Sequence, residues 1–306
     1  MAVPPEDVIR FRSLHESGVV QIREYRCSAC KGGPGAEEAS EANTLVLMRH
    51  GAFCRHFGRR RVTADVNQAA FFSKGSTYRV SHPGGDGDRG TIFRVPQRIL
   101  DEFLREWDPS AEEHPGRALP FAAGPCEASV FWRHRGLVQA LEGAGSPALE
   151  PFWADVTALQ IVADVLGAGF ARQGAPMRSR KTGTALDHLE LIEAGKLYFA
   201  EHLGERLTLD GVARALNTSP FHFARIFQWG TGVPLHRYLT QLRLRASLDP
   251  LAEGRRDLTE LALDLGFSSH SHFTGLFRRE FGTTPSEVRS HASARRLGEL
   301  SKILEA

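Results

Sequence analysis

The 306-residue sequence has few features that would place it outside the ordinary globular class. It holds only four cysteines, Cys27, Cys30, Cys54 and Cys126, which are too few and too scattered for a disulfide scaffold in a chain of this size. No apolar run reaches the ~18–20 residues that a membrane-spanning helix needs. The first residues also lack a basic stretch followed by an apolar one. We therefore expect a cytoplasmic protein with reduced thiols and no membrane partner.

An excess of charge of one sign is also missing. The 38 Lys and Arg residues nearly balance the 36 Asp and Glu residues, and the formal net charge is +2. From Ala185 to Ala306 the balance is even, with 15 residues of each sign. Composition alone therefore does not indicate a nucleic-acid partner, and any basic surface must arise from the placement of individual charges. The length allows two domains with cores of their own.

The first third of the chain consists of short apolar segments separated by turn residues. The predicted strands share alternation or a high content of β-branched and aromatic residues, and they cover residues 19–27, 44–53, 69–75, 77–83 and 91–96. Short strands at this spacing indicate an antiparallel barrel or sandwich. At Gln97 the pattern changes to that of a helix. We expect a β-barrel domain over residues 1–110.

Two further helices are predicted in a connector region over residues 111–173, roughly Glu127 to Leu141 and Leu149 to Arg172. The second is apolar on more than one side, and one of its stripes is formed by Phe152, Val156, Leu159, Val162, Ala163 and Leu166. Such a helix needs a second partner surface, which is either the barrel or another copy of the chain. A polar, basic linker follows over residues 174–184.

The last third contains an internal repeat with a shift of fifty residues. An H-F-x-x-x-F motif that starts at His222 and is followed by Gly232 recurs from His272, followed by Gly282. Each copy comes after a shorter helix and a tight turn. Such an arrangement fits a helix-turn-helix unit, whose second helix enters a DNA major groove. A helical bundle with a purely structural repeat is the alternative, which two copies with matching glycines disfavour.

Capping residues support the boundaries of both units. The expected caps are Ser219 with Pro220 at the first helical position, the capping box Asp257-x-x-Glu260, Gly266 after the last apolar residue of its helix, and Thr284-x-x-Glu287 with Pro285. On the longer helices, one face is apolar and must be core, formed by Phe223, Ile226, Phe227, Phe273, Leu276 and Phe277.

Residues 207–290 resemble the C-terminal DNA-binding domain of the AraC/XylS transcription regulators. The segment TELALDLGFSSHSHFTGLFRREFGTTPSEVR carries the clearest similarity, and SPFHFARIFQWGTGVPLHRYLTQLRLRAS is a looser match, in which Pro234 lies one residue earlier than the counterpart of Pro285. The resemblance implies a DNA-binding domain over residues 185–292 and a tail over residues 293–306. It also implies a cupin-like sensor barrel followed by helices that often dimerise. The expected fold class is multidomain α+β, with an all-α C-terminal domain.

The resemblance places base-contacting residues on the second helix of each unit. Carried over by position they are Phe221, Ala224, Arg225, His270, Ser271, Thr274 and Gly275, and the exposed face of the first unit's second helix adds Gln228. An arginine can bind guanine with two hydrogen bonds, and a glutamine can do the same with adenine. Because Gly275 stands where the first unit has Arg225, we expect the first unit to supply more of the sequence specificity.

Contacts to the DNA backbone should come from helix N-termini and from nearby arginines. The candidates are Arg243, Arg245, Arg278, Arg279, Thr283, Thr284 and Arg289. The expected partners are double-stranded DNA, a small-molecule effector, a second copy of the chain and, for an activator, RNA polymerase. The operator, the effector and the sign of regulation are left open by the sequence.

The barrel is the expected receiver of the effector, because β architectures of this size can enclose one small ligand. Candidate wall residues are Phe53, Phe72, Tyr78, Arg79 and His82, and ordinary core packing is the alternative role for them. No cofactor is predicted.

A thiol or metal sensor is the other hypothesis that the sequence leaves open. Cys27-x-x-Cys30 could form half of a zinc site, with Cys54-x-His56 as the nearest partner, although this spacing is not a known zinc motif. A methyl-acceptor DNA-repair family also joins a metal-thiolate domain to such a tail, but its four-Cys spacing is missing here. A cupin enzyme would need a His-x-His cluster on the strands, which is missing too. We therefore expect a protein that is not an enzyme.

Overall fold

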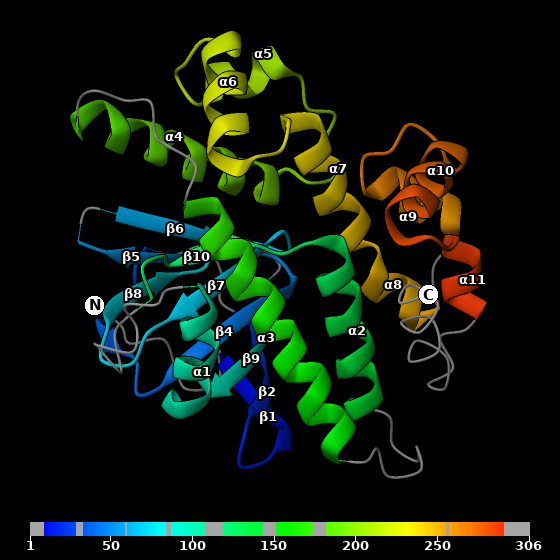
Figure 1. The fold of residues 1–306 in the computed structure, drawn as a ribbon. Helices are drawn as coiled ribbons and strands as arrows, with labels where there is room; N and C mark the ends of the chain where they lie inside the picture. The colour runs from blue at the N-terminus through cyan, green and yellow to red at the C-terminus, as the bar shows by residue number, and fades with distance from the viewer. Residues whose placement is uncertain are drawn as a thin grey trace.

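A computed structural model of the chain describes residues 9–28, 33–58, 60–83, 87–107, 119–142, 151–173, 182–254 and 257–290 (Figure 1). The strands are β1 (Ile9–Glu16), β2 (Gln21–Cys27), β3 (Glu38–Ala39), β4 (Asn43–His50), β5 (Phe53–Phe57), β6 (Arg60–Ala64), β7 (Gln68–Phe72), β8 (Thr77–Ser81), β9 (Asp88–Val95) and β10 (Ala123–Pro125). The helices are α1 (Gln97–Trp107), α2 (Ala128–Glu142), α3 (Pro151–Gln173), α4 (Thr182–Glu201), α5 (Leu209–Ala215), α6 (Pro220–Thr231), α7 (Leu235–Ala246), α8 (Leu248–Glu253), α9 (Leu258–Asp264), α10 (His270–Phe281) and α11 (Pro285–Ser290). Cys30, most of the predicted linker and the tail over residues 293–306 lie outside the described residues.

The strands form two antiparallel sheets. The larger has the order β1-β2-β9-β4-β7-β10 and the smaller has the order β3-β8-β5-β6. The antiparallel β-domain is thus confirmed, although no strand pairing between the described residues closes the two sheets into a barrel. The strand predicted over residues 44–53 is interrupted at Gly51, whose φ of +69° suits glycine. At this residue the chain leaves the larger sheet and enters the smaller one.

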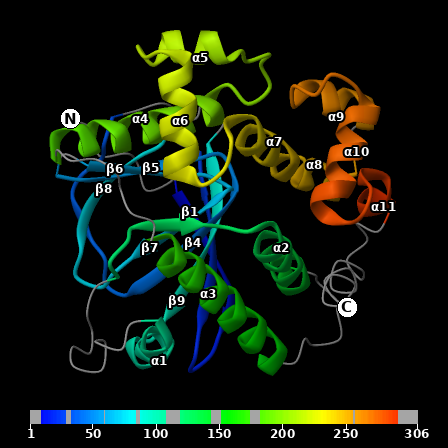
Figure 2. The same cartoon turned by 45° about the horizontal axis from the view of Figure 1, so that its top comes forward.

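Helices α2 and α3 pack side by side against the larger sheet, with α3 against β10 (Figures 1 and 2). The inner face of α3 is buried and includes Ala158, Ile161 and Val165. By length and composition alone, residues 152–172 could cross a membrane, which the sequence analysis did not anticipate. Because α3 packs against α2 and β10, its apolar residues contribute to the core of the N-terminal half. At the outer end of the helix, Phe152 remains 74% exposed and Val156 47% exposed.

The described part of the chain from α4 onward is helical, as predicted. The connecting helix begins at Leu235, with Pro234 just before it, and it is divided at Ser247 into α7 and α8. Helix α7 therefore links the two helix-turn-helix units, which stand apart at the top of the molecule and at its right in Figure 1.

The inner face of α7 is docked on the β-domain. Tyr238 donates a hydrogen bond from its hydroxyl to Oδ2 of Asp65 at 2.7 Å, and its carbonyl accepts one from Asn67 at 3.1 Å. Two helical turns further on, Arg245 donates to the carbonyl of Val66 at 2.7 Å. Its guanidinium carbon lies 4.8 Å from the ring centroid of Phe131 on α2. These contacts are buried, so the two domains share a polar interface that excludes water.

Both helix-turn-helix units also touch the N-terminal half directly. On the side of the second unit, Trp132 of α2 stacks on Phe281 of α10 with 5.3 Å between ring centroids, and Arg135 pairs with Asp249 of α8. On the side of the first unit, Arg172 of α3 donates to the carbonyl of Thr231 at 2.6 Å. The N-terminal half therefore contacts α7 and the units at both of its ends.

Candidate nucleic-acid interface

The first helix-turn-helix unit consists of α5 and α6. Thr208 caps α5 by accepting the backbone N–H of Gly211, and Ser219 caps α6 by accepting that of His222. Pro220 occupies the first position of α6, where a missing N–H breaks no helical bond. Gly232 ends the helix with a φ of +74°. The predicted boundaries of this unit are confirmed.

The second unit consists of α9 and α10 and repeats the same design. The Asp257 side chain accepts the N–H groups of Thr259 and Glu260, and Ser269 caps α10. The turn between the helices contains Gly266 with a φ of +77°, and α10 ends at Gly282 with a φ of +73°. In both units, therefore, residues close in sequence determine where each helix begins and ends.

Each second helix has one buried and one exposed face. The predicted core residues are buried, except that Leu276 is partly buried. On α6 the side chains of Phe221, Arg225 and Gln228 are exposed, whereas Ala224 is half-buried. The Arg225 guanidinium carbon lies 6.0 Å from the ring centroid of Phe221, so the two side chains occupy one surface.

The exposed face of α10 presents fewer hydrogen-bonding side chains at the candidate base-contacting positions than that of α6 does. Ser271 and Gly275 are exposed, and His270 and Thr274 are half-buried. A Cβ added to Gly275 would meet no atom within 4 Å, which places this residue on an open surface. Arg278 and Arg279, near the C-terminal end of α10, are also exposed. Five of the eight candidate base-contacting residues are therefore exposed among the described residues, and Ala224, His270 and Thr274 are half-buried.

The structure corrects the expectation that Arg245 contacts a DNA phosphate. Its side chain points into the domain interface, and the residue is only 1% exposed. The guanidinium of Arg243 also has protein partners, because it donates to the carbonyls of Leu203, Gly266 and Glu205 at 2.9, 2.9 and 2.6 Å. Because these carbonyls belong to segments before the first unit and inside the second, Arg243 fixes one unit relative to the other.

Thr283 and Thr284 were also expected to contact phosphate, but a carboxylate of the protein occupies their donors. Oε2 of Glu287 accepts the Thr283 hydroxyl and the Thr284 N–H, both at 2.8 Å, and Thr284 Oγ1 accepts the N–H of Glu287 at 3.2 Å. This is the predicted capping box of α11. The two threonines therefore stabilise the start of α11 in this structure. Arg278, Arg279 and Arg289 remain exposed candidates for phosphate.

None of the predicted effector residues lines the cavities found among the described residues that lie beside the first helix-turn-helix unit and at the end of β9. Phe53 and Phe72 are buried and pack together, with Tyr78 against Phe72, whereas Arg79 is exposed. His82 lies apart from them, next to Asp88. Phe53 and Phe72 belong to the buried core, and the half-buried Tyr78 packs against it, so their packing agrees with the alternative role considered for them. The guanidinium carbon of Arg55 lies 4.5 Å from the ring centroid of Phe72.

A cavity of about 1100 Å³ lies instead between the β-domain and the first helix-turn-helix unit. Its basic wall residues are Arg55, Arg60, Arg61 and Arg172, together with Lys196, and its acidic ones are Glu190 and Glu193. Lys196 pairs with Glu193 at 2.7 Å. Apolar walls come from Phe71, Phe121, Leu186, Leu189 and Trp229. Burial lowers the pKa of Arg55 to about 10, so its guanidinium still carries a positive charge at neutral pH.

Sequence comparisons identify the family. A family model described as "Helix-turn-helix domain" matches residues 212–291. The regulatory protein SoxS of Salmonella typhimurium is 33% identical over 104 residues, which cover 34% of this chain and 97% of SoxS. The chain belongs to the AraC/XylS family of transcription regulators. It is a DNA-binding protein whose binding domain is the pair of units described above.

Other relatives of this AraC/XylS regulator extend beyond its C-terminal domain. The transcriptional activator RhaS of Salmonella schwarzengrund is 24% identical over 260 residues, covering 84% of this chain and 88% of RhaS. Among solved structures, ToxT of Vibrio cholerae aligns over 89% of this chain and 98% of its own, with 12% identity and a TM-score of 0.35. An AraC-type regulator of Chromobacterium violaceum aligns over 36% and 96%, with 29% identity and a TM-score of 0.32.

Sequence reasoning missed the residues that hold this AraC/XylS regulator together across its domain interface. Asp65, in the turn before β7, is fully buried and accepts Tyr238 and the Asn67 N–H. Its burial raises its pKa to about 6, against the opposing effects of Lys196 and of the two hydrogen bonds. A turn motif of the type A-D-V-N-Q looks like a solvated loop in sequence, so nothing local indicated that α7 covers it.

Proposed function

We propose that this AraC/XylS regulator contacts DNA bases with α6 and α10 and that a small anionic molecule in the interdomain cavity controls this binding. The main support for this proposal is the position of the cavity, because both the β-domain and the DNA-binding domain form its walls. A ligand held there touches residues 229–232 at the end of α6 as well as residues of the β-domain. It can therefore favour one arrangement of the first unit over another, which is what a regulatory ligand must do.

The chemistry of the walls favours an anion with an apolar part. Four arginines outnumber the acidic groups, and one of those acidic groups is already paired with Lys196. Guanidinium groups bind carboxylate or phosphate through two parallel hydrogen bonds. The rings of Phe71, Phe121 and Trp229 offer apolar surface beside them. The volume lies just above the roughly 300–1,000 Å³ that is typical of ligand pockets, so the occupant does not have to fill the cavity.

For DNA, we propose unequal roles for the two units. The exposed Arg225 and Gln228 of α6 can make paired hydrogen bonds to guanine and adenine, and Phe221 can contact a thymine methyl group. Helix α10 contributes Ser271 and Thr274 and, at Gly275, close backbone approach. Arg278, Arg279 and Arg289 would contact the backbone. The chain would act in the cytoplasm, without catalysis, as a regulator that recruits RNA polymerase if it is an activator.

The DNA assignment is tested by fluorescence anisotropy with duplexes selected from the protein's own genome. Arg225→Ala should weaken specific binding about 5- to 150-fold, which corresponds to the roughly 1–3 kcal/mol of one bidentate base contact. Arg214→Ala is the matched control, because Arg214 is 80% exposed on α5 and pairs with Asp210 of the same helix. Equal losses in both variants, or no loss with Arg225→Ala, would show that α6 is not the base-contacting helix.

The effector assignment is tested separately by thermal unfolding with a set of carboxylates and phosphates and their neutral isosteres. We expect anions to raise the unfolding temperature of the wild type and to lose this effect with Arg60→Gln combined with Arg61→Gln. These residues line the cavity, and neither lies on a DNA-contacting helix. Stabilisation by neutral isosteres to the same extent would refute a site for anions.

A further inference from the structure

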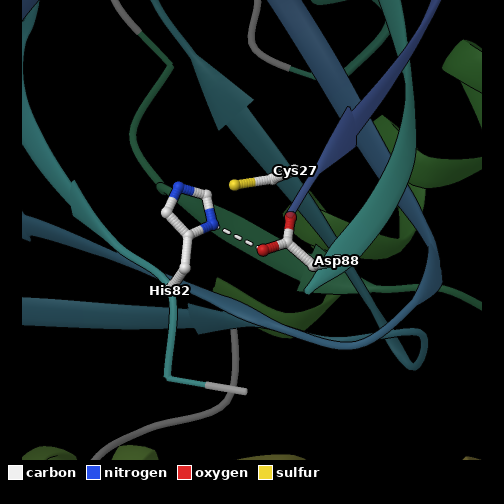
Figure 3. Close-up of side chains that lie close together, drawn as sticks. All are labelled: Cys27, His82 and Asp88. Carbon is white, nitrogen blue, oxygen red and sulfur yellow. Dashed lines mark hydrogen bonds and ion pairs between the residues drawn. The ribbon is translucent and has the colours of Figure 1, made fainter. Parts of the chain in front are cut away.

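Three side chains that can bind a metal meet where the two sheets adjoin (Figure 3). Cys27 ends β2, Asp88 begins β9 and His82 directly follows β8. Their ligand atoms, which are the thiol sulfur, a ring nitrogen and a carboxylate oxygen, all lie within 4.8 Å of one another. Among the described residues this is the one cluster of Cys, His, Asp and Glu side chains with such spacing.

The fold itself brings these residues together. Cys27 and Asp88 are directly opposite each other in the antiparallel register of β2 and β9. Gly87 has a φ of +76°, and a Cβ there would lie 2.2 Å from the carbonyl oxygen of Cys27. A glycine is therefore needed for the chain to enter β9 so close to Cys27. His82 arrives from the smaller sheet at the end of β8, so the cluster draws on both sheets.

The hydrogen bonding of Asp88 is incomplete. One oxygen, Oδ2, lies 2.5 Å from Nδ1 of His82. The other, Oδ1, is buried without a hydrogen-bond partner among the described residues, and the residue is only 3% exposed. The nearby Tyr25 hydroxyl donates to Sδ of Met48 at 3.0 Å and can also hydrogen-bond Asp88; burial and this carboxylate raise the pKa of Tyr25. A buried carboxylate oxygen that shares its one nearby donor with another acceptor is under-satisfied, and a cation in the cluster would compensate it.

We propose that Cys27, His82 and Asp88 form a site for one divalent metal ion of the zinc class. Sulfur, imidazole nitrogen and carboxylate oxygen are the ligand types that Zn²⁺ takes, at about 2.0–2.3 Å. A thiolate and a carboxylate also balance the two charges of the ion, which leaves the buried site neutral. The ion would replace the proton shared by His82 and Asp88, and a water could take the fourth position. Ligand atoms in a tetrahedron of this size are roughly 3.3–3.8 Å apart, so shifts of about 1 Å suffice.

This site differs from the one considered in the sequence analysis. Cys54 and His56 lie on β5 and have other partners, since Sγ of Cys54 lies 3.6 Å from Thr63 Oγ1 and Nε2 of His56 lies 2.7 Å from Ser81 Oγ. Only Cys27 is shared between the two hypotheses. A metal at the new site would tie the end of β8, in the smaller sheet, to β2 and β9 in the larger one. It would therefore stabilise the N-terminal domain as a whole.

The experiment uses the full chain, stripped with a chelator and titrated with Co²⁺ and then Zn²⁺. We expect one metal per chain by elemental analysis, a thiolate-to-cobalt charge-transfer band, and a higher unfolding temperature. Free metal at 100 times its Kd should raise the folding equilibrium constant about 100-fold. Cys27→Ser, His82→Gln and Asp88→Asn should each weaken binding and lower these signals. Cys54→Ser is the matched control, because it removes another buried thiol and should keep them all.

The proposal is overturned if the wild type binds no stoichiometric metal, or if Cys27→Ser keeps the charge-transfer band while Cys30→Ser or Cys54→Ser loses it. Circular dichroism checks that each variant folds. Should Cys27→Ser fail to fold, the half-buried His82 provides the same test through His82→Gln. None of these readouts involves DNA or an anionic effector, so they do not depend on the function proposed above.

Discussion

The buried carboxyl of Asp65 should make the stability of the docked chain depend on pH. Burial raises the pKa of Asp65 from its ordinary 3.8 to about 6 in the folded protein. A raised folded-state pKa means that the folded chain holds this proton more tightly than the unfolded chain does. The contribution of Asp65 is therefore neutral below pH 3.8 and becomes increasingly unfavourable as the pH rises to about 6, above which it stays constant.

The magnitude follows from the shift. At 1.36 kcal/mol for each pKa unit, deprotonation of Asp65 costs about 3 kcal/mol in total, of which about 1.4 kcal/mol develops between pH 5 and pH 8. Asp65→Asn has nearly the same size but cannot ionise. Its one carbonyl oxygen can keep only one of the two hydrogen bonds that Asp65 accepts from Tyr238 and Asn67, a loss that does not depend on pH. Relative to the wild type, this variant should therefore gain about 1.4 kcal/mol of unfolding free energy between pH 5 and pH 8.

Urea denaturation of both proteins at the two pH values measures this difference directly. Asp210→Asn is the control, because it makes the same chemical change at a side chain that is 68% exposed on α5. Its difference from the wild type should not change between the two pH values. If the difference between Asp65→Asn and the wild type were also the same at pH 5 and pH 8, the carboxyl would not carry the buried charge inferred here.

Three further predictions concern the DNA-binding domain and assembly. Gly275→Ala should stabilise the protein by about 0.8 kcal/mol in urea denaturation, because the new methyl group meets open space in a helix; a loss of stability would contradict this. Arg243→Ala should cost about 3 kcal/mol, because three carbonyls lose a charged donor, and unchanged denaturation would refute its connecting role. We also expect the exposed Phe152 and Val156 of α3 to form a homodimer contact, so Phe152→Asp with Val156→Asp should sediment as a monomer where the wild type is a dimer. A wild type that sediments as a monomer would contradict this prediction.

The helix-turn-helix units could be predicted because their information is local. Ser219, Asp257 and Gly266 act within about four residues of the helix ends that they define, and their side chains or φ angles are as expected. The buried faces of α6 and α10 followed from a 3.6-residue period in the same way. Local sequence therefore contained nearly everything needed for this part of the candidate site.

The errors concern residues whose partners lie far away in sequence. Arg243 and Arg245 looked like solvated cations on a helix beside DNA, because periodicity places a residue on a face without showing what covers that face. Their partners come from segments 23 to 179 residues away. Cys27 was likewise paired with Cys54 by sequence proximity, whereas strand register placed it opposite Asp88. Contacts of this kind depend on which strands pair and in which register. The alternation of apolar and polar residues within each strand does not determine this pairing.

The hidden face of α7 has a consequence for how such regulators can be recombined. A chimera that kept the DNA-binding domain but took residues 1–173 from a relative would leave Tyr238 and Arg245 against a foreign surface. Without the Val66 carbonyl and the Phe131 ring, a buried guanidinium would lack compensation, which typically costs about 3–5 kcal/mol. Changes on the exposed faces of α6 and α10 carry no such cost. New operators can therefore be acquired one substitution at a time, whereas a new sensor requires coordinated replacement of the face on which it sits.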